Sequence, residues 1–371
     1  MTLRSWLVDR FFRSEVDQRI RLAIPVRDDA PGYRAATTPL LQQNWSDVRS
    51  LIEAATTLGR THPLAARILA LTTDFVVGAG PEVTGDDWAL SFWHDPRNRL
   101  DQRLHRWCDE LSRTGELFLV LSRNPASGMS YVREVPAVLI DRIETDPHDL
   151  ECELSYHQLT QDIEGITWQA AGAQTPVEQV MLHYTINRPV GEVRGRSDLA
   201  AVIPWLEHYS MWLEDRVRIN RYKGAYLWQV QVANALPGQL EAKRAQYSRI
   251  PQSGSILVTD AAETWTAVQP NIGADDVSAD GKALRLAISA GAGIPLHWLG
   301  EGESTNRATA REMNAATLRH YAQRQREFGL ILRDLVRVAA QRAGQPEPRI
   351  EFAFAPLEAS GEIATTESKA N

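Results

Sequence analysis

Apolar residues recur at helical spacing through the first third of the chain. Over residues 44–77 the pattern predicts helix, with Asn44 or Ser46 as the cap, and the first apolar stripe comprises Val48, Leu51, Ile52, Ala55 and Leu58. A second helix is predicted from Pro63 to Phe75. An amphipathic helix is predicted from Asp101 to Arg113, because its apolar residues again fall on one face.

Residues 1–40 lack such a pattern. They combine charged residues with short apolar pairs, and Pro25, Pro31, Gly32 and Pro39 interrupt them. The pattern predicts one short helix over residues 3–12 and then an extended arm. The sequence leaves open whether this arm docks on the body, docks on a neighbouring subunit or is disordered.

Short runs of apolar and β-branched residues occupy the next part of the chain. Strands are predicted at Leu117–Ser122 and, interrupted by Pro136, at Tyr131–Ile143. Three shorter strands are predicted at 154–158, 166–169 and 179–184. Their regular spacing predicts a small barrel or sheet packed on the helices.

The second half is dominated by three long helical patterns, at residues 197–223, 275–292 and 305–343. Ser197 is a good N-cap for the first, and Pro204 is predicted to kink it one or two turns later. Between the first two helices lies an insert with the pattern strand, helix, strand, strand. The predicted strands are 226–232, 255–258 and 264–268, and the helix is 237–247.

Composition excludes several classes of protein. The chain has 371 residues, of which 43% are hydrophobic, so it can bury a sizeable core. Its net charge of −7 argues against a protein that grips DNA over its whole surface, because such proteins are usually basic. Cys108 and Cys152 alone make no disulfide framework, and residues 1–26 show no signal-peptide pattern.

Motifs for catalysis are weak. Gly78-Ala79-Gly80 resembles the start of a dinucleotide-binding turn, but Val83 stands where the third glycine belongs. The turn at 191–197 resembles a shortened phosphate-binding loop, without its lysine. His105 and Cys108 lie three residues apart, but no second pair at ligand spacing supports a metal site. The sequence therefore predicts no enzyme, no cofactor and no metal.

The order of elements from about residue 187 onward is more informative. Residues 195–199 read Gly-Arg-Ser-Asp-Leu, residues 220–225 read Asn-Arg-Tyr-Lys-Gly-Ala, and residues 293–300 read Gly-Ile-Pro-Leu-His-Trp-Leu-Gly. Upstream, residues 113–116 read Arg-Thr-Gly-Glu before an apolar strand. In this order the motifs resemble those of the portal proteins, or head-to-tail connectors, of tailed double-stranded-DNA bacteriophages.

The resemblance implies an α+β fold and an elongated, portal-type subunit. A mixed helix-and-sheet wing would carry two stem helices that flank a small αβ clip, and a long C-terminal helix would return to the wing. The implied divisions are an N-terminal arm (1–40), the wing (41–196), the first stem helix (197–225), the clip (226–270), the second stem helix (271–296), a tunnel loop (297–306), the long wing helix (307–343) and a short crown or disordered tail (344–371).

The resemblance also implies a function without catalysis. Such a subunit forms a homo-oligomeric ring, dodecameric in the family, at one vertex of the virion capsid. The ring is the channel through which double-stranded DNA is packaged and ejected, without sequence specificity. Implied partners are the terminase large subunit, a head-tail adaptor, and the major capsid and scaffold proteins. Assembly would take place in the host cytoplasm, with no membrane involved.

Candidate functional residues follow from this resemblance. The residues expected to face the tunnel and its DNA are Lys282, Arg285, Glu301, Glu303, Asn306, Arg307 and Arg311. The clip residues expected to contact a partner are Lys243, Arg244 and Arg249. The alternative for each of these residues is a charge exposed to solvent or a salt bridge between subunits, with no role in the tunnel or in binding a partner.

Three alternatives stay open at this stage. The chain could be a nucleotide-handling α+β enzyme that uses one of the glycine-rich turns. It could be another ring protein of a phage neck or tail, although such proteins are usually shorter and lack paired stem helices around an insert. It could also be the portal of a gene-transfer particle, which sequence alone does not distinguish from a phage portal.

Overall fold

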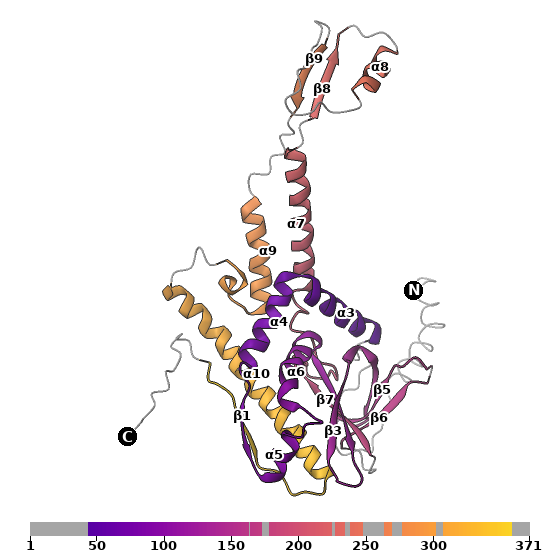
Figure 1. Cartoon of the computed structure of the whole chain (residues 1–371), viewed down its shortest axis with the longest axis vertical. Coiled ribbons are helices and arrows are strands. Elements are labelled where there is room, and N and C mark those ends of the chain that lie inside the picture. The colour runs from indigo at the N-terminus through magenta and orange to yellow at the C-terminus, as the bar shows by residue number, and fades with distance from the viewer. Residues whose placement is uncertain are drawn as a thin grey trace, which may run out of the picture.

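The protein is elongated, with a broad body, a projecting pair of helices and a small tip (Figure 1). This computed structural model describes residues 44–162, 164–172, 178–224, 227–233, 238–247, 263–268, 277–301 and 307–357. The N-terminal arm predicted at 1–40 lies outside these residues.

Five helices belong to the body, namely α3 (Trp45–Thr61), α4 (Pro63–Val76), α5 (Asp87–Trp93), α6 (Leu100–Thr114) and α10 (Arg307–Arg342). The predicted cap of α3 is confirmed, because the side chain of Asn44 accepts a hydrogen bond from the amide of Ser46 at 3.4 Å. His62 caps α4 through its ring Nδ1, which accepts from the amide of Leu64 at 3.1 Å.

The predicted strands of the body form one six-stranded sheet in the order β3-β2-β7-β6-β5-β4. The strands are β2 (Glu116–Arg123), β3 (Ser130–Val135), β4 (Ile140–Asp146), β5 (Asp149–Gln158), β6 (Ile166–Ala170) and β7 (Gln179–Thr185). All neighbours are antiparallel except β6 and β7, which are parallel.

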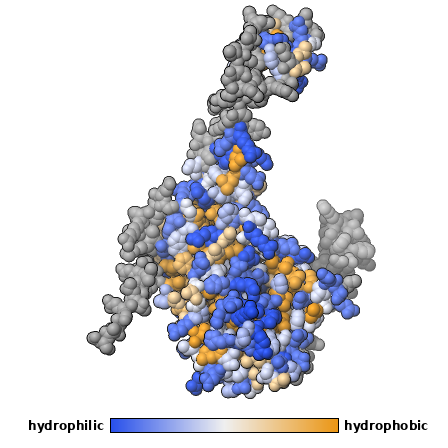
Figure 2. Space-filling view, in the orientation of Figure 1, coloured by the Kyte–Doolittle hydropathy of each residue, from blue (hydrophilic) through white to orange (hydrophobic). Residues whose placement is uncertain are grey.

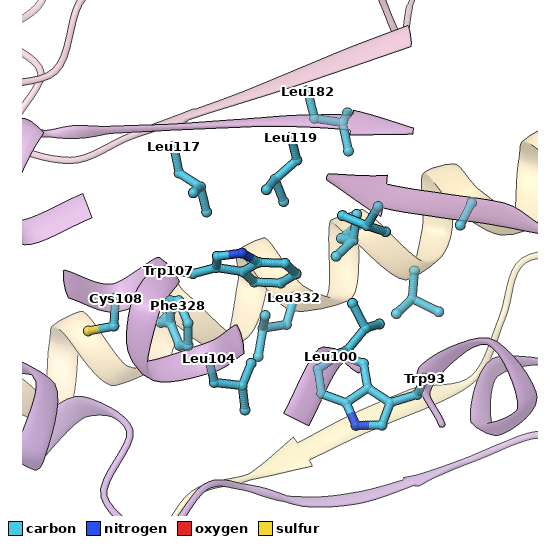
Figure 3. Packing of buried hydrophobic residues seen from close by; sticks show 14 of the residues in the cluster. Trp93, Leu100, Leu104, Trp107, Cys108, Leu117, Leu119, Leu182, Phe328 and Leu332 are labelled. Carbon is cyan, nitrogen blue, oxygen red and sulfur yellow. The ribbon is translucent and has the colours of Figure 1, made fainter. Parts of the chain in front are cut away.

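The two faces of β2 pack against different parts of the body, because successive side chains of a strand point to opposite faces. Leu117 and Leu119 face a core that contains Trp107 of α6 and Phe328 of α10 (Figure 3). Phe118, on the opposite face, belongs to a second core that contains residues of β4, β5 and α3. Helix α10 and the β4–β5 hairpin therefore lie on opposite sides of the central strands.

Part of the predicted tail belongs to the body. Residues 350–353 form β10 (Ile350–Ala353), which pairs antiparallel with β1 (Glu82–Gly85). Asp86 fixes this pairing, because its carboxylate accepts from the amide of Arg349 at 2.7 Å and from the amide of Ala89 at 2.9 Å. The prediction of a crown or disordered tail is therefore wrong for residues 344–357, and β1, α5 and β10 were not predicted.

Two helices, α7 (Ile203–Gly224) and α9 (Val277–Ala292), project from the body and pack on each other. A Cβ on Gly281 would lie 2.5 Å from the ring of Trp212, so the absence of a side chain there lets the two helices approach closely. The first helix starts at Ile203 and not at Ser197, and residues 198–202 are turns. Pro204 lies in the first turn, where its missing N–H is not needed, so it does not kink the helix.

The tip consists of β8 (Leu227–Val232), α8 (Gln239–Gln246) and β9 (Glu263–Val268), with the two strands antiparallel. The strand predicted at 255–258 lies outside the described residues. After α9, a short 3₁₀ turn over Leu296–Leu299 ends at Gly300, which has a φ of 102°. No helix in the described ranges is long and apolar enough to span a membrane.

Candidate functional site at the base of the stem

Two of the motifs that carried the sequence analysis touch each other where the body meets the stem. A Cβ on Gly195 would lie 2.0 Å from the carbonyl oxygen of Gly115, and a Cβ on Gly115, which has a φ of 87°, would lie 2.4 Å from the backbone of Arg196. Ile186 links the two segments, because its amide donates to the Gly115 carbonyl at 2.9 Å and its carbonyl accepts from the Arg196 amide at 3.0 Å. Both glycines are required by this close approach.

Asp198 is the centre of the junction. Its carboxylate accepts hydrogen bonds from the Ser112 hydroxyl at 2.6 Å, from the Asn187 amide at 2.7 Å and from the Arg324 guanidinium at 3.0 Å. These partners come from α6, from the segment after β7 and from α10. A short turn over residues 199–202 leads from Asp198 into α7, so this carboxylate links three parts of the body close to the start of the stem.

A buried charged cluster lies beside this junction. Glu116 is fully buried and accepts from Arg194 at 2.9 Å, and it contacts the His183 ring at 3.2 Å. The other ring nitrogen of His183 lies 2.8 Å from Glu153. The His183 ring also stacks on Phe118, with 4.3 Å between ring centroids. The wing sheet therefore contains an alternating series of positive and negative groups inside its core.

The charges in the cluster stabilise each other. Burial by itself lowers the pKa of His183, but the Glu153 charge and hydrogen bonds with Glu116 and Glu153 raise this pKa to about 9. Burial by itself raises the pKa of Glu116, but Arg194 and His183 lower it below its ordinary value overall. Each group is thus held in its charged form inside the protein.

The tunnel residues predicted on α9 differ in their surroundings. Lys282 is exposed, whereas Arg285 is half-buried and forms an ion pair with Glu301 at 3.2 Å. The Arg285 Nε also donates to the Gly281 carbonyl at 3.3 Å. The structure therefore brings Arg285 and Glu301 together, and their pair connects α9 to the middle of the predicted tunnel loop.

The other predicted tunnel residues are less fully placed. Glu303 and Asn306 lie outside the described residues. Arg307 and Arg311 belong to the start of α10, and their side chains also lie outside the described part.

Of the three residues predicted to contact a partner from the clip, the structure describes two, Lys243 and Arg244. Lys243 forms an ion pair with Glu263, which also accepts from the Tyr247 hydroxyl at 2.9 Å. Arg244 is exposed on α8, and Arg249 lies outside the described residues. The Lys243 charge therefore helps hold α8 against β9, a role that the sequence did not predict.

Apolar side chains are exposed along the stem, amid hydrophilic ones (Figure 2). On α7 and α9 the exposed large hydrophobic residues are Trp205, Met211, Leu213, Val217 and Leu286. At the base of the stem a groove of about 690 Å³ is lined partly by small residues, including Ala201, Gly291 and Ala316. Exposed apolar residues on a projecting element are typical of a surface that another protein covers.

The residues that suggested an enzyme have structural partners. His105 contacts the Gly78 carbonyl at 2.9 Å, while Cys108 is buried in the core, where burial raises the pKa of its thiol to about 12. In the turn at 191–197, Arg194 is committed to Glu116 and the backbone at Gly195 is covered by Gly115. Among the described residues, no group of three or more His, Cys, Asp or Glu side chains is arranged to hold a metal ion.

Arg324 and His183 were not predicted as parts of a site. Arg324 lies on the face of α10 that carries Tyr321 and Phe328, and it is only 7% exposed. A charge within an apolar stripe indicates a buried partner, so this signal was present in the sequence. The partner, Asp198, is 126 residues away and could not be identified from spacing.

Known structures share this fold, although no protein-family model and no curated protein matches the sequence. A chain from the neck of a native gene transfer agent particle, computed with C12 symmetry, is 14% identical with a TM-score of 0.55 over 82% of this chain and 85% of that one. A chain from the neck of the empty particle, computed with C6 symmetry, is 14% identical with a TM-score of 0.58 over the same shares.

A weaker similarity, with a TM-score of 0.42 and 12% identity over 81% of this chain and 95% of that one, is to a crystal structure of an HK97 family phage portal protein from Corynebacterium diphtheriae. That score is too low to support an argument. The helices and mixed sheets confirm the predicted α+β class, and the neck chains share the fold.

The Asp198–Arg324 pair generates a prediction about stability. Asp198→Ala removes three hydrogen bonds and leaves the buried Arg324 with Glu327, 3.8 Å from its Nε, as its only acidic partner among the described residues, so we expect the free energy of unfolding to fall by about 1–3 kcal/mol in guanidinium denaturation. Combining Asp198→Ala with Arg324→Met removes both charges and should destabilise less than the sum of the two single changes. Arg218→Ala is the control, because this exposed arginine pairs only at the surface of α7 and its loss should change stability by less than about 1 kcal/mol. Additive effects at Asp198 and Arg324 would contradict the assigned coupling.

His183 generates a prediction about pH. Its pKa rises from 6.5 to about 9 on folding, so its contribution to stability is fully present below the lower value and is lost as pH rises through the higher one. We expect the free energy of unfolding to fall between these values by on the order of 1 kcal/mol per pH unit. His183→Gln should flatten this dependence, whereas His148→Gln, at an exposed histidine, should not. An unchanged pH dependence in His183→Gln would show that the cluster does not hold the proton.

Proposed function

We propose that the chain is the portal subunit of a tailed phage or of a gene-transfer particle, and that it forms the ring through which DNA enters and leaves the capsid. The observation that carries this proposal is the order of parts along the chain. A wing leads into one stem helix, a small αβ tip, a second stem helix and a long helix that returns into the wing. The same fold occurs in the neck chains of the gene transfer agent particle.

The surface of the isolated subunit supports assembly into a ring. The exposed apolar residues of the stem lie on a projecting pair of helices, where burial requires a neighbour. A closed ring needs two different complementary surfaces on each subunit, and the groove at the base of the stem beside the exposed residues of α7 supplies two candidates. Twelve copies are the number that the C12 neck suggests.

The charge of the chain supports passage of DNA. Each basic contact with phosphate adds salt-dependent affinity, whereas a subunit with a net charge of −7 repels DNA overall. Under this proposal Lys282 and the first arginines of α10 guide the DNA locally. The Arg285–Glu301 pair then sets the position of the middle of the tunnel loop.

The tip and the wing are each proposed to contact other proteins of the particle. The tip, with Arg244 exposed, contacts the terminase large subunit during packaging and the head-tail adaptor afterwards. The wing contacts the major capsid and scaffold proteins. The ring itself occupies the portal vertex of the virion. The second candidate is another ring protein of the particle neck, and the likeness to the neck chains supports it as well.

The tunnel loop generates the test of this function. Glu301, Glu303 and Asn306 together replaced by alanine should leave ring assembly intact and reduce the length or yield of packaged DNA. The matched control replaces Glu347 and Glu351, two exposed acidic residues near β10, by alanine. Particles assembled with each variant are compared by the amount and length of protected DNA. Unchanged genome length and yield in the loop variant would overturn the role assigned to the loop.

A further inference from the structure

Three arginines follow one exposed line along α10. Arg319, Arg326 and Arg333 are seven residues apart, so they lie on nearly the same face of the helix and span about 21 Å. All three are exposed, and none forms an ion pair with any residue that the structure describes. Two other arginines of the helix have acidic partners, Arg324 in Asp198 at 3.0 Å and Arg337 in Asp334 at 2.5 Å.

An apolar residue interrupts the line. Leu330 is 54% exposed and lies between Arg326 and Arg333. A hollow of about 500 Å³ runs beside it and is lined by Arg319, Arg326 and Leu330 among others. We call Arg319, Arg326, Leu330 and Arg333 the α10 ridge. A basic line with an exposed leucine at its centre has the composition of a contact surface more than that of a solvated face.

A surface of opposite charge lies on the β4–β5 hairpin and the turn into β6. Its exposed acidic residues are Glu144, Asp149, Glu151, Asp162 and Glu164, of which Glu144 pairs with Arg142 at 3.3 Å and Glu151 with Arg188 at 3.8 Å. Two apolar residues are exposed among them, Leu154 at 39% and Ile166 at 43%. We call these seven residues the acidic ribbon. The ten residues of β5 extend over about 33 Å, which is long enough to accept the α10 ridge.

The ridge and the ribbon cannot meet within one subunit. Helix α10 packs on the face of β2 that carries Leu117 and Leu119, whereas β4 and β5 enclose the face that carries Phe118. The α10 ridge and the acidic ribbon therefore lie on opposite sides of the wing. This is the arrangement that a head-to-tail ring requires, because each subunit presents one surface to each of its two neighbours.

We propose that the α10 ridge of one subunit docks on the acidic ribbon of the next copy of this chain. This inference rests on the proposed ring and assigns the contact that joins neighbouring wings. The arginines pair with the carboxylates of the ribbon, and Leu330 packs against Leu154 and Ile166. The opposite charges favour the correct order of surfaces and disfavour ridge against ridge or ribbon against ribbon.

Two charge-reversed chains test the contact. One carries Arg319→Glu, Arg326→Glu and Arg333→Glu, and the other carries Glu144→Lys, Asp149→Lys and Glu151→Lys. In either chain alone the ridge and the ribbon have the same sign, so we expect each to remain folded by circular dichroism but to form few rings in native mass spectrometry. Mixed in equal amounts, they should form rings in which the two chains alternate, because each ridge then meets a ribbon of opposite charge.

The outcomes separate this contact from the proposed function. Rings of normal yield from either reversed chain alone, or no rescue by mixing two folded chains, would overturn the contact while leaving the wild-type ring intact. A reversed ridge that assembles normally but loses packaged DNA would show that the ridge faces nucleic acid, which also overturns the contact. Failure of the wild-type chain to form any ring would instead remove the proposed function on which the contact rests.

Discussion

The carboxylate of Asp198 is the constraint on which the rest of the structure depends. It binds Ser112 of α6, Asn187 after the central sheet and Arg324 of α10, just before the turn that leads into α7. A buried charge pair stabilises a protein only when its hydrogen bonds are satisfied, and this carboxylate has three donors. The direction of the stem relative to the body is therefore set by this polar junction together with an apolar core, in which Leu199, Val202 and Leu206 pack against residues of α3 and α4.

Around this point the segments of the body are in close contact, whereas the stem leaves apolar side chains exposed. Gly115 and Gly195 bring two backbone segments into direct contact, and the His183 cluster connects strands inside the sheet. The stem, in contrast, exposes Trp205, Met211 and Val217. A rigid body with unburied apolar helices is what a ring subunit needs, because neighbours then complete the core without reshaping the wing.

Sequence patterns predicted the elements whose signal is local. The helices of the body except α5, the strands of the large sheet and the two stem helices were found because their apolar residues repeat along the chain. The pairing of β1 with β10 was missed because Gly85 and Ile350 are partners across most of the chain and each strand has only four residues. The start of α7 was placed too early because Ser197 has the character of a cap, although it stabilises a turn through the Leu199 amide at 3.0 Å.

The candidate site was predictable in part for the same reason. Gly195 and Gly115 both belong to motifs that are recognisable in the sequence. Their contact could not be predicted, because the two motifs are far apart in the chain and meet only in the folded protein. Arg324 and His183 carry the charges that hold the junction, and neither has its partners nearby in sequence. The tunnel residues on α9 were predicted by resemblance, and the pairing of Arg285 with Glu301 emerged only when the turn after the helix was placed.

The most direct measurement for this account is the oligomeric state of the purified wild-type chain, by negative-stain electron microscopy and native mass spectrometry of the same sample. The account predicts rings with a central channel and a mass close to that of twelve copies of the 41.5 kDa chain. A chain that stays monomeric or dimeric at all accessible concentrations would contradict it.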